Sequence, residues 1–147
     1  MDICGGNSNQ RKTRVGVIIK GSGTYIYLNK KLNVNEGDIV FIPENIYCYS
    51  EWHGNPEIEV IYVSCFMHYE QFWYEPQIIN CDKTIKDSLL EISNLLSINY
   101  IKELEAYSLF YKLLQQLLPA MTRSNISYDK TLQTAIEFIT DNWNKNF

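Results

Sequence analysis

The sequence predicts a mainly β fold with an added α-helical part: a small antiparallel β-barrel or sandwich, two long antiparallel helices, and the start of a further helix. Three observations support this prediction. Short β-branched and aromatic runs separated by turn residues fill the first part of the chain, and the hydrophobic period becomes helical after Pro76. The length of 147 residues, 46% of them hydrophobic, suits one core and is short for two domains.

Five or six strands are expected between Val15 and about Phe66. The runs are VGVIIK, TYIYL, KLNV, DIVFI and IEVIYVSCF, and a strand is also expected to start near Ile46. Turn signals recur about every 8 to 12 residues, which is typical of antiparallel sheets because short loops join neighbouring strands directly. A parallel sheet would need crossover helices, and the chain has no room for them here.

The first long helix is predicted in TIKDSLLEISNLLSINY. Its apolar residues recur at the spacing of one helix face, and they are Ile85, Leu89, Ile92 and Leu96. Thr84 and Asp87 form an imperfect capping box, with Asp in the place of Glu. Asn99 is expected to mark the break before the second helix.

The second helix, from Tyr100 to Met121, has more apolar surface than one neighbour can cover. A heptad-like seam is formed by Leu104, Tyr107, Tyr111, Leu114, Leu118 and Met121. Two outcomes are open. Either the first helix and the β part cover this helix together, or the seam meets its copy in a symmetric homodimer.

Charge and cysteine content exclude several classes of protein. Thirteen Lys and Arg against seventeen Asp and Glu give a net charge of −4, so the chain lacks the basic surface of a nucleic-acid binder. No apolar run reaches the roughly 18 residues of a membrane span, and the N-terminus has no signal-peptide core, so we expect a cytoplasmic protein without membrane contact. The four cysteines lack the close pairing of a zinc site or a disulfide framework, and are Cys4, Cys48, Cys65 and Cys81.

The order and spacing of these segments resemble the N-terminal half of the AraC-type bacterial transcription regulators. The resemblance covers nearly all of the chain. It is carried by Gly21-Ser22-Gly23-Thr24, the Gly37-Asp38 turn with its run to Pro43 and Asn45, the strand ending near Phe66, and the pattern from Ala135 to Ile139. It implies a cupin-like barrel that binds a small-molecule effector such as a sugar, followed by helices that form a homodimer.

The resemblance also implies three parts of the chain. Residues 1–80 would be the cupin-like effector-binding barrel, 81–122 the helical dimerisation hairpin, and 123–147 a linker and the first helix of a truncated helix-turn-helix domain. DNA would then be bound only through the missing C-terminal part. The alternative is that the last amphipathic helix, over 131–147, folds back onto the barrel.

No metal, cofactor or enzymatic activity is expected. Metal-binding cupins place two histidines and a glutamate on one strand pair and a further histidine later, but GSGTYIYLNKK contains no histidine and Cys48 stands in the later place. His53 and His68, the two histidines, are expected to be ordinary side chains. Ser50 and Ser64 do not lie in a nucleophile elbow. A small metal-dependent cupin enzyme remains the alternative.

A small organic ligand fits the residues better. If the strand near Ile46 alternates, Cys48, Ser50 and Trp52 share one face, and the resemblance turns the Cys48 face inward. Trp52 or Tyr62 could offer a flat surface to a sugar ring, with directional hydrogen bonds from Ser50, Arg14 or a tyrosine hydroxyl. Tyr25 and Tyr27 share one strand face, but the side is open. The alternative is that these aromatic residues only pack, leaving a dimerisation module without a ligand.

Overall fold

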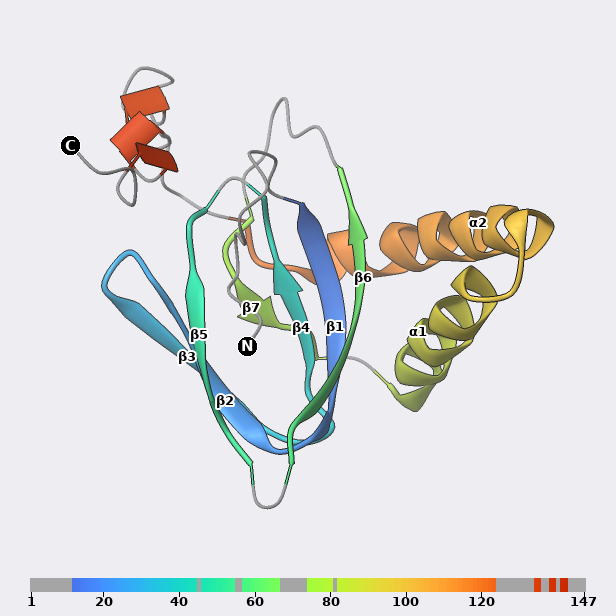
Figure 1. Cartoon of the computed structure of the whole chain (residues 1–147), viewed down its shortest axis with the longest axis horizontal. Coiled ribbons are helices and arrows are strands. Elements are labelled where there is room, and N and C mark those ends of the chain that lie inside the picture. The colour runs from blue at the N-terminus through green and yellow to red at the C-terminus, as the bar shows by residue number, and fades with distance from the viewer. Residues whose placement is uncertain are drawn as a thin grey trace.

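In a computed structural model of the chain, the strands form two antiparallel sheets, and two helices pack on the outer face of one of them (Figure 1). The structure describes residues 12–44, 46–54, 57–66, 74–80, 82–123, 134–135, 138–139 and 141–142. The strands are β1 (Thr13–Lys20), β2 (Ser22–Tyr27), β3 (Lys30–Val34), β4 (Ile39–Ile42), β5 (Tyr49–His53), β6 (Glu59–Cys65) and β7 (Gln77–Ile78). The helices are α1 (Lys83–Leu96), α2 (Tyr100–Leu117) and the 3-10 turn η1 (Leu118–Ala120).

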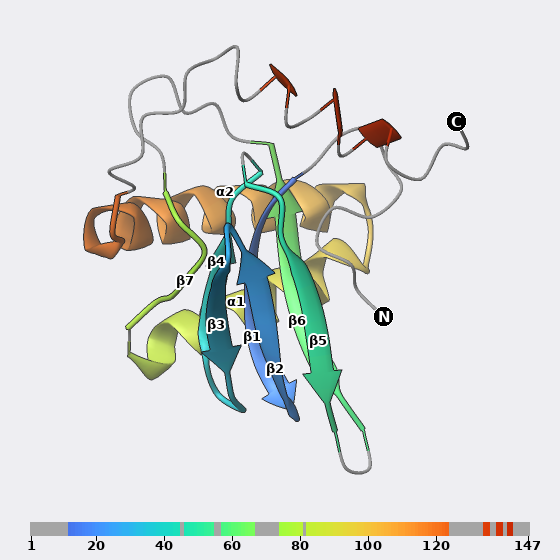
Figure 2. The same ribbon diagram turned by 90° about the vertical axis from the view of Figure 1, so that its left-hand side faces the viewer.

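The two sheets form an open sandwich. The larger sheet has the strand order β6-β1-β4-β7, and the smaller has the order β3-β2-β5. Figure 2 shows the smaller sheet in front of the larger one, with the helices behind. The prediction of an antiparallel barrel or sandwich followed by two long helices is confirmed in its sandwich form, because the described strands of the two sheets are not hydrogen-bonded into a closed ring.

Alternation of side chains along the strands divides the interior into two cores. In β1, Val15 and Val17 face the helices, whereas Ile18 faces the smaller sheet. We call the second core, between the sheets, the intersheet layer. Its buried members are Ile18, Tyr25, Tyr27, Val34, Val40, Ile42, Ile46 and Cys48, and Leu32, Trp52, Val60 and Tyr62 pack against them.

The start of α1 differs from the predicted capping box. The N-cap is Asp82, whose Oδ1 accepts the backbone N–H of Thr84 at 3.0 Å and also the Thr84 hydroxyl. These hydrogen bonds lower the pKa of Asp82, and the one from the Thr84 hydroxyl has the larger effect. Thr84 therefore lies within the first turn, because the nearer carboxylate binds the free N–H group. The predicted face of α1 is confirmed for Ile85, Leu89 and Ile92, which are buried, while Leu96 is 38% exposed.

Asn99 separates the two helices as predicted, and it acts as the N-cap of α2. Its Oδ1 accepts the backbone N–H of Lys102 at 3.0 Å. We expect Asn99→Ala to lower the free energy of unfolding by about 1 kcal/mol, because this N–H group loses its acceptor. Urea unfolding followed by circular dichroism measures the loss. Asn99→Asp keeps the acceptor and is the control; equal losses in both variants would contradict the capping role.

The structure bears on two further predictions, the end of the second helix and the presence of a third. The second helix ends as an α-helix at Leu117 and tightens into η1, because Pro119 has no N–H group to continue the α-helical pattern, so Met121 lies beyond the helix. Most of the predicted third helix, over 131–147, lies outside the described residues; residues 134–135, 138–139 and 141–142 have helical conformation. Among the residues that the structure describes, no helix is long and apolar enough to cross a membrane.

Candidate functional site

The candidate site is the open edge of the sandwich between β5 and β6. These two strands follow each other in the chain, and each forms one end of its sheet. Figure 1 shows the two strands close together at the bottom and diverging upward. A cavity of about 810 Å³ lies at this edge, lined by Ser50, Glu51, Trp52, His53, Ile58, Glu59 and Val60. Successive residues of a strand point to opposite faces of its sheet. Since neighbouring residues of β5, and those at the start of β6, line the cavity together, it lies along the edges of the two strands as well as against their inward side chains.

Two aromatic rings in the site lie against glycines on the neighbouring strands. Gly23 of β2 is paired with Trp52 of β5, and a Cβ atom at Gly23 would come 2.5 Å from Trp52 Cε3. In the larger sheet, Gly16 of β1 is paired with Tyr62 of β6, and a Cβ atom there would come 2.5 Å from Tyr62 Cδ1. The absence of a side chain at both glycines therefore sets where the two rings can lie.

The rings are linked by polar and aromatic contacts across the intersheet layer. The Tyr25 and Tyr62 hydroxyls form a hydrogen bond between the two sheets. Tyr25 also meets the edge of Trp52, with ring centroids 5.6 Å apart, and Trp52 Nε1 donates to Ser50 Oγ at 3.0 Å. The Arg14 guanidinium lies over the Tyr62 ring, 5.9 Å from its centroid. The result is one connected aromatic cluster with hydroxyl groups and a cation at its margin.

The structure places the predicted ligand-binding residues in or beside the intersheet layer. The predicted alternation of β5 is confirmed: Cys48 is buried and Ser50 and Trp52 are half-buried, while Tyr47, Tyr49 and Glu51 are exposed. The side of β2 left open by the sequence is also decided, since Tyr25 and Tyr27 are buried in the layer.

Only two of the seven predicted residues, Ser50 and Trp52, line the cavity itself. Cys48, Tyr25 and Tyr27 are packed in the layer, and Arg14 and Tyr62 lie beside it. Sequence reasoning missed the β6 side of the cavity, which Ile58, Glu59 and Val60 form. Their position just after the β5–β6 loop was a usable signal, because a short connection brings both of its ends to the same place.

Lys20, at the end of β1, forms ion pairs with Glu57, just before β6, and Glu59, the first residue of β6. Lys20 Nζ lies 2.8 Å from Glu57 Oε1 and 3.7 Å from Glu59 Oε2. The hydrogen bond and charge of Glu57 raise the pKa of Lys20, and the same contacts lower the pKa of Glu57. All three side chains are about half exposed or more, so these ion pairs add little stability.

The histidine, cysteine and acidic side chains of the described residues are dispersed. Within the described parts of the chain, no three His, Cys, Asp or Glu side chains lie close enough together to hold a metal ion. Burial, and secondarily the negative charge of Glu44, raises the pKa of the Cys65 thiol to about 11, so this thiol is protonated at neutral pH. His53 is exposed at the end of β5. His68, Cys4 and Cys81 lie outside the described residues.

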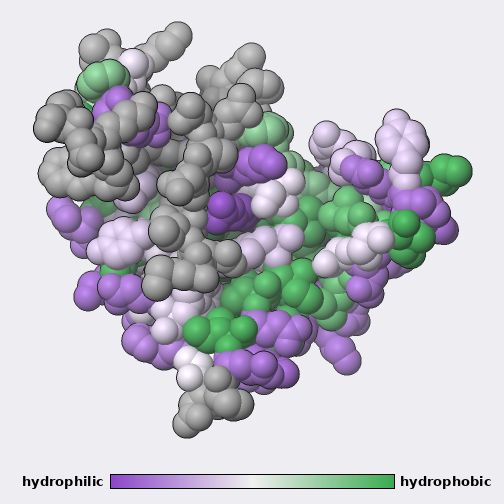
Figure 3. All heavy atoms as spheres, viewed as in Figure 1, coloured by the Kyte–Doolittle hydropathy of each residue, from purple (hydrophilic) through white to green (hydrophobic). Residues whose placement is uncertain are grey.

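The six residues of the predicted dimer seam do not share one surface. Leu114 and Met121 are buried in the core that the helices share with the larger sheet, and Leu118 is half-buried against the same core, because α1 and the β residues of this core cover that side of the chain. Leu104, Tyr107 and Tyr111 are 49%, 46% and 72% exposed. Tyr100 and Ile101 extend this exposed face toward the α1–α2 turn, where Figure 3 shows apolar side chains at the surface. The dimer interface stays a prediction, now limited to the exposed residues.

Comparison with known proteins gives a fold match without a sequence family. No family model matches the chain, and no curated protein matches it. Among solved structures, the chain is similar to ToxT from Vibrio cholerae, an AraC-family regulator, with a TM-score of 0.50 and 16% sequence identity. The match covers 92% of this chain and 58% of the ToxT chain. This chain therefore has the fold of that regulator over somewhat more than half of the regulator's length.

Proposed function

We propose that this chain is the effector-sensing and dimerisation module of an AraC-family transcription regulator. The observation that carries the proposal is the 810 Å³ cavity at the open β5–β6 edge of a fold shared with ToxT. A ligand there meets the indole of Trp52, the Ser50 hydroxyl and the apolar side chain of Val60. Such a mixture of a flat apolar surface and a few directional groups suits a small organic molecule with hydroxyl groups, such as a sugar.

The proposal assigns DNA binding to another part of the regulator. The net charge of −4 disfavours contact of this module with the phosphate backbone. The part of the ToxT chain that this chain does not match leaves room for a helix-turn-helix domain in the whole regulator. A regulator of transcription acts in the cytoplasm of a bacterium, and the chain is accordingly proposed to work there, without catalysis of its own.

A thermal-shift screen with monosaccharides tests the sensing function. A ligand that binds only the folded state stabilises it by about 2.7 kcal/mol at a concentration of 100 times its dissociation constant. We expect at least one sugar to raise the melting temperature of the wild type, and Trp52→Ala to abolish that rise. Tyr49→Ala, on the exposed face of the same strand, is the control and should keep the response. A sugar that stabilises the wild type and Trp52→Ala equally would place the ligand elsewhere.

One observation favours a second candidate function. Cys48, Tyr25 and Tyr27 fill much of the space between the sheets with the chain's own side chains. A module of this kind could dimerise through the exposed residues of α2 without binding an effector. If no small molecule shifts the melting temperature while the chain sediments as a dimer, this second function is the better description.

A further inference from the structure

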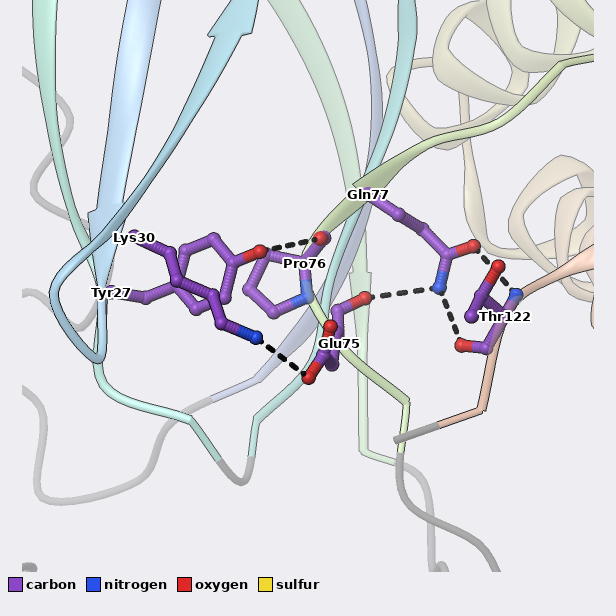
Figure 4. A network of polar contacts seen from close by, with 6 residues as sticks. All are labelled: Tyr27, Lys30, Glu75, Pro76, Gln77 and Thr122. Atoms are coloured by element: carbon purple, nitrogen blue, oxygen red, sulfur yellow. Dashed lines mark hydrogen bonds and ion pairs between the residues drawn. The ribbon is translucent and has the colours of Figure 1, made fainter. Parts of the chain in front are cut away.

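The side chain of Gln77, in strand β7 of the larger sheet, binds Thr122 in the segment that follows the helices. The carboxamide of Gln77 in β7 contacts both backbone groups of Thr122: Thr122 N donates to Gln77 Oε1 at 2.8 Å, and Gln77 Nε2 donates to Thr122 O at 3.0 Å (Figure 4). We call this pair of hydrogen bonds the Gln77 clasp. The next residue, Arg123, forms a β-bridge with Tyr74, so the segment stays alongside the same stretch of chain.

The residues just before Gln77 contact the smaller sheet. The Tyr27 hydroxyl, in the intersheet layer, donates to the carbonyl oxygen of Pro76 at 3.4 Å. Lys30 Nζ, at the start of β3, lies 3.3 Å from Glu75 Oε1. Gln77 Nε2 also donates to the Glu75 carbonyl at 3.0 Å, which fixes the orientation of its carboxamide. Residues 75–77 therefore contact the smaller sheet through Tyr27 and Lys30 on one side and Thr122 on the other, as Figure 4 shows.

β7 is the shortest of the described strands. Its two residues pair with Phe41 and Val40 of β4, and the next residue, Ile79, donates its N–H to the carbonyl oxygen of Ile39 at 2.8 Å. Tyr27 is two residues from Tyr25, whose ring meets Trp52 at the cavity. A ligand that displaces Trp52 would therefore disturb the Tyr25 ring on β2, the strand whose Tyr27 hydroxyl donates to Pro76 O.

We propose that Gln77 is a positioning residue that couples the intersheet layer to residues 121–123. This coupling rests on the proposed sensing function. An occupied cavity would act through Tyr27 and Pro76 on Gln77, and through Gln77 on the backbone of Thr122. Glutamine suits this role because its carboxamide has an acceptor for the N–H of Thr122 and N–H donors for the carbonyl oxygens of Thr122 and Glu75. Energetic coupling of this kind requires that a change at one end alter the equilibrium at the other.

Hydrogen exchange at the Thr122 amide, measured by NMR, tests the coupling without any ligand. Gln77→Ala removes the acceptor, and we expect exchange at Thr122 to become at least tenfold faster. The double variant Tyr27→Phe/Lys30→Ala leaves Gln77 in place and removes both contacts to residues 75–76. We expect exchange at Thr122 to become several-fold faster in this variant, while the amides of Leu89 and Leu113 in the helices keep their rates.

The matched control is Tyr49→Phe/Lys31→Ala, which changes the same residue types at exposed positions of the smaller sheet. Its Thr122 amide should exchange as in the wild type. An unchanged rate at Thr122 in Tyr27→Phe/Lys30→Ala would overturn the coupling, as would a uniform acceleration of all amides. Should Gln77→Ala not fold, Gln77→Glu keeps the acceptor but loses the donor, and an intermediate exchange rate is expected. Failure here is separate from failure of the sugar screen, since no sugar is used.

Discussion

Leu114→Asp should prevent stable folding of the chain, whereas Tyr111→Asp should only separate the proposed dimer. Leu114 is 5% exposed in the core between the sheet and the helices, and its aspartate would lose apolar packing and bury an unpaired carboxylate. We expect a loss of about 4 kcal/mol or more in the free energy of unfolding. Tyr111 is 72% exposed on α2, so its aspartate should change the free energy of the single chain by less than about 1 kcal/mol.

Two measurements separate the effects. Urea unfolding reports the free energy, and sedimentation velocity reports the mass in solution. Tyr111→Asp should sediment as a folded monomer, because a charge in an apolar interface lacks a partner. Gln116→Asp adds the same charge at another exposed position of α2 and should leave the dimer intact. A dimer that survives Tyr111→Asp would move the interface away from α2.

Gly23→Ala should lose both stability and ligand binding, because the new methyl group occupies the place of the Trp52 ring. Its Cβ atom would lie 2.5 Å from Trp52 Cε3 and 2.9 Å from the carbonyl oxygen of Glu51. The ring and the β5 backbone must both move, and overpacking of this kind costs about 1–3 kcal/mol. We expect the near-ultraviolet circular dichroism contributed by Trp52, defined by difference from Trp52→Phe, to change, and the response to an active sugar to disappear.

Gly37→Ala is the control for this prediction. Gly37 has a φ of +92°, so alanine there is strained, yet no atom lies within 4 Å of its added Cβ. This variant should also lose stability, by about 1–3 kcal/mol, but keep the Trp52 signal and the sugar response. If Gly23→Ala kept the wild-type signal of Trp52, the glycine would not determine the position of the ring.

Local sequence patterns predicted the features that depend on neighbouring residues in the chain. The alternation of Cys48, Ser50 and Trp52 placed these side chains on one face, and the structure confirms it. The spacing of Ile85, Leu89 and Ile92 predicted the buried face of α1. Two-residue and helical periods are properties of the backbone itself, so they can be recognised without knowing what covers each face.

The errors and omissions occur where distant parts of the chain meet. Leu114 and Tyr111 belong to one apolar pattern, and only the packing of α2 against α1 and the β residues of the same core separates the buried residue from the exposed one. The two-residue strand β7 is too short to leave a periodic signal, and it forms only because β4 is beside it.

The sequence by itself determined the order of strands β1 to β6 and of the two long helices, the shared face of the β5 residues, and the excess of apolar surface on α2. Only the tertiary structure decided the open β5–β6 edge, the glycines beneath Trp52 and Tyr62, and the clasp of Gln77 on Thr122. The physical reason is that periodicity is set by local backbone geometry, whereas strand pairing and side-chain contacts join residues far apart in the chain. Gln77 and Thr122 are separated by 45 positions, and no local sequence pattern predicts their contact.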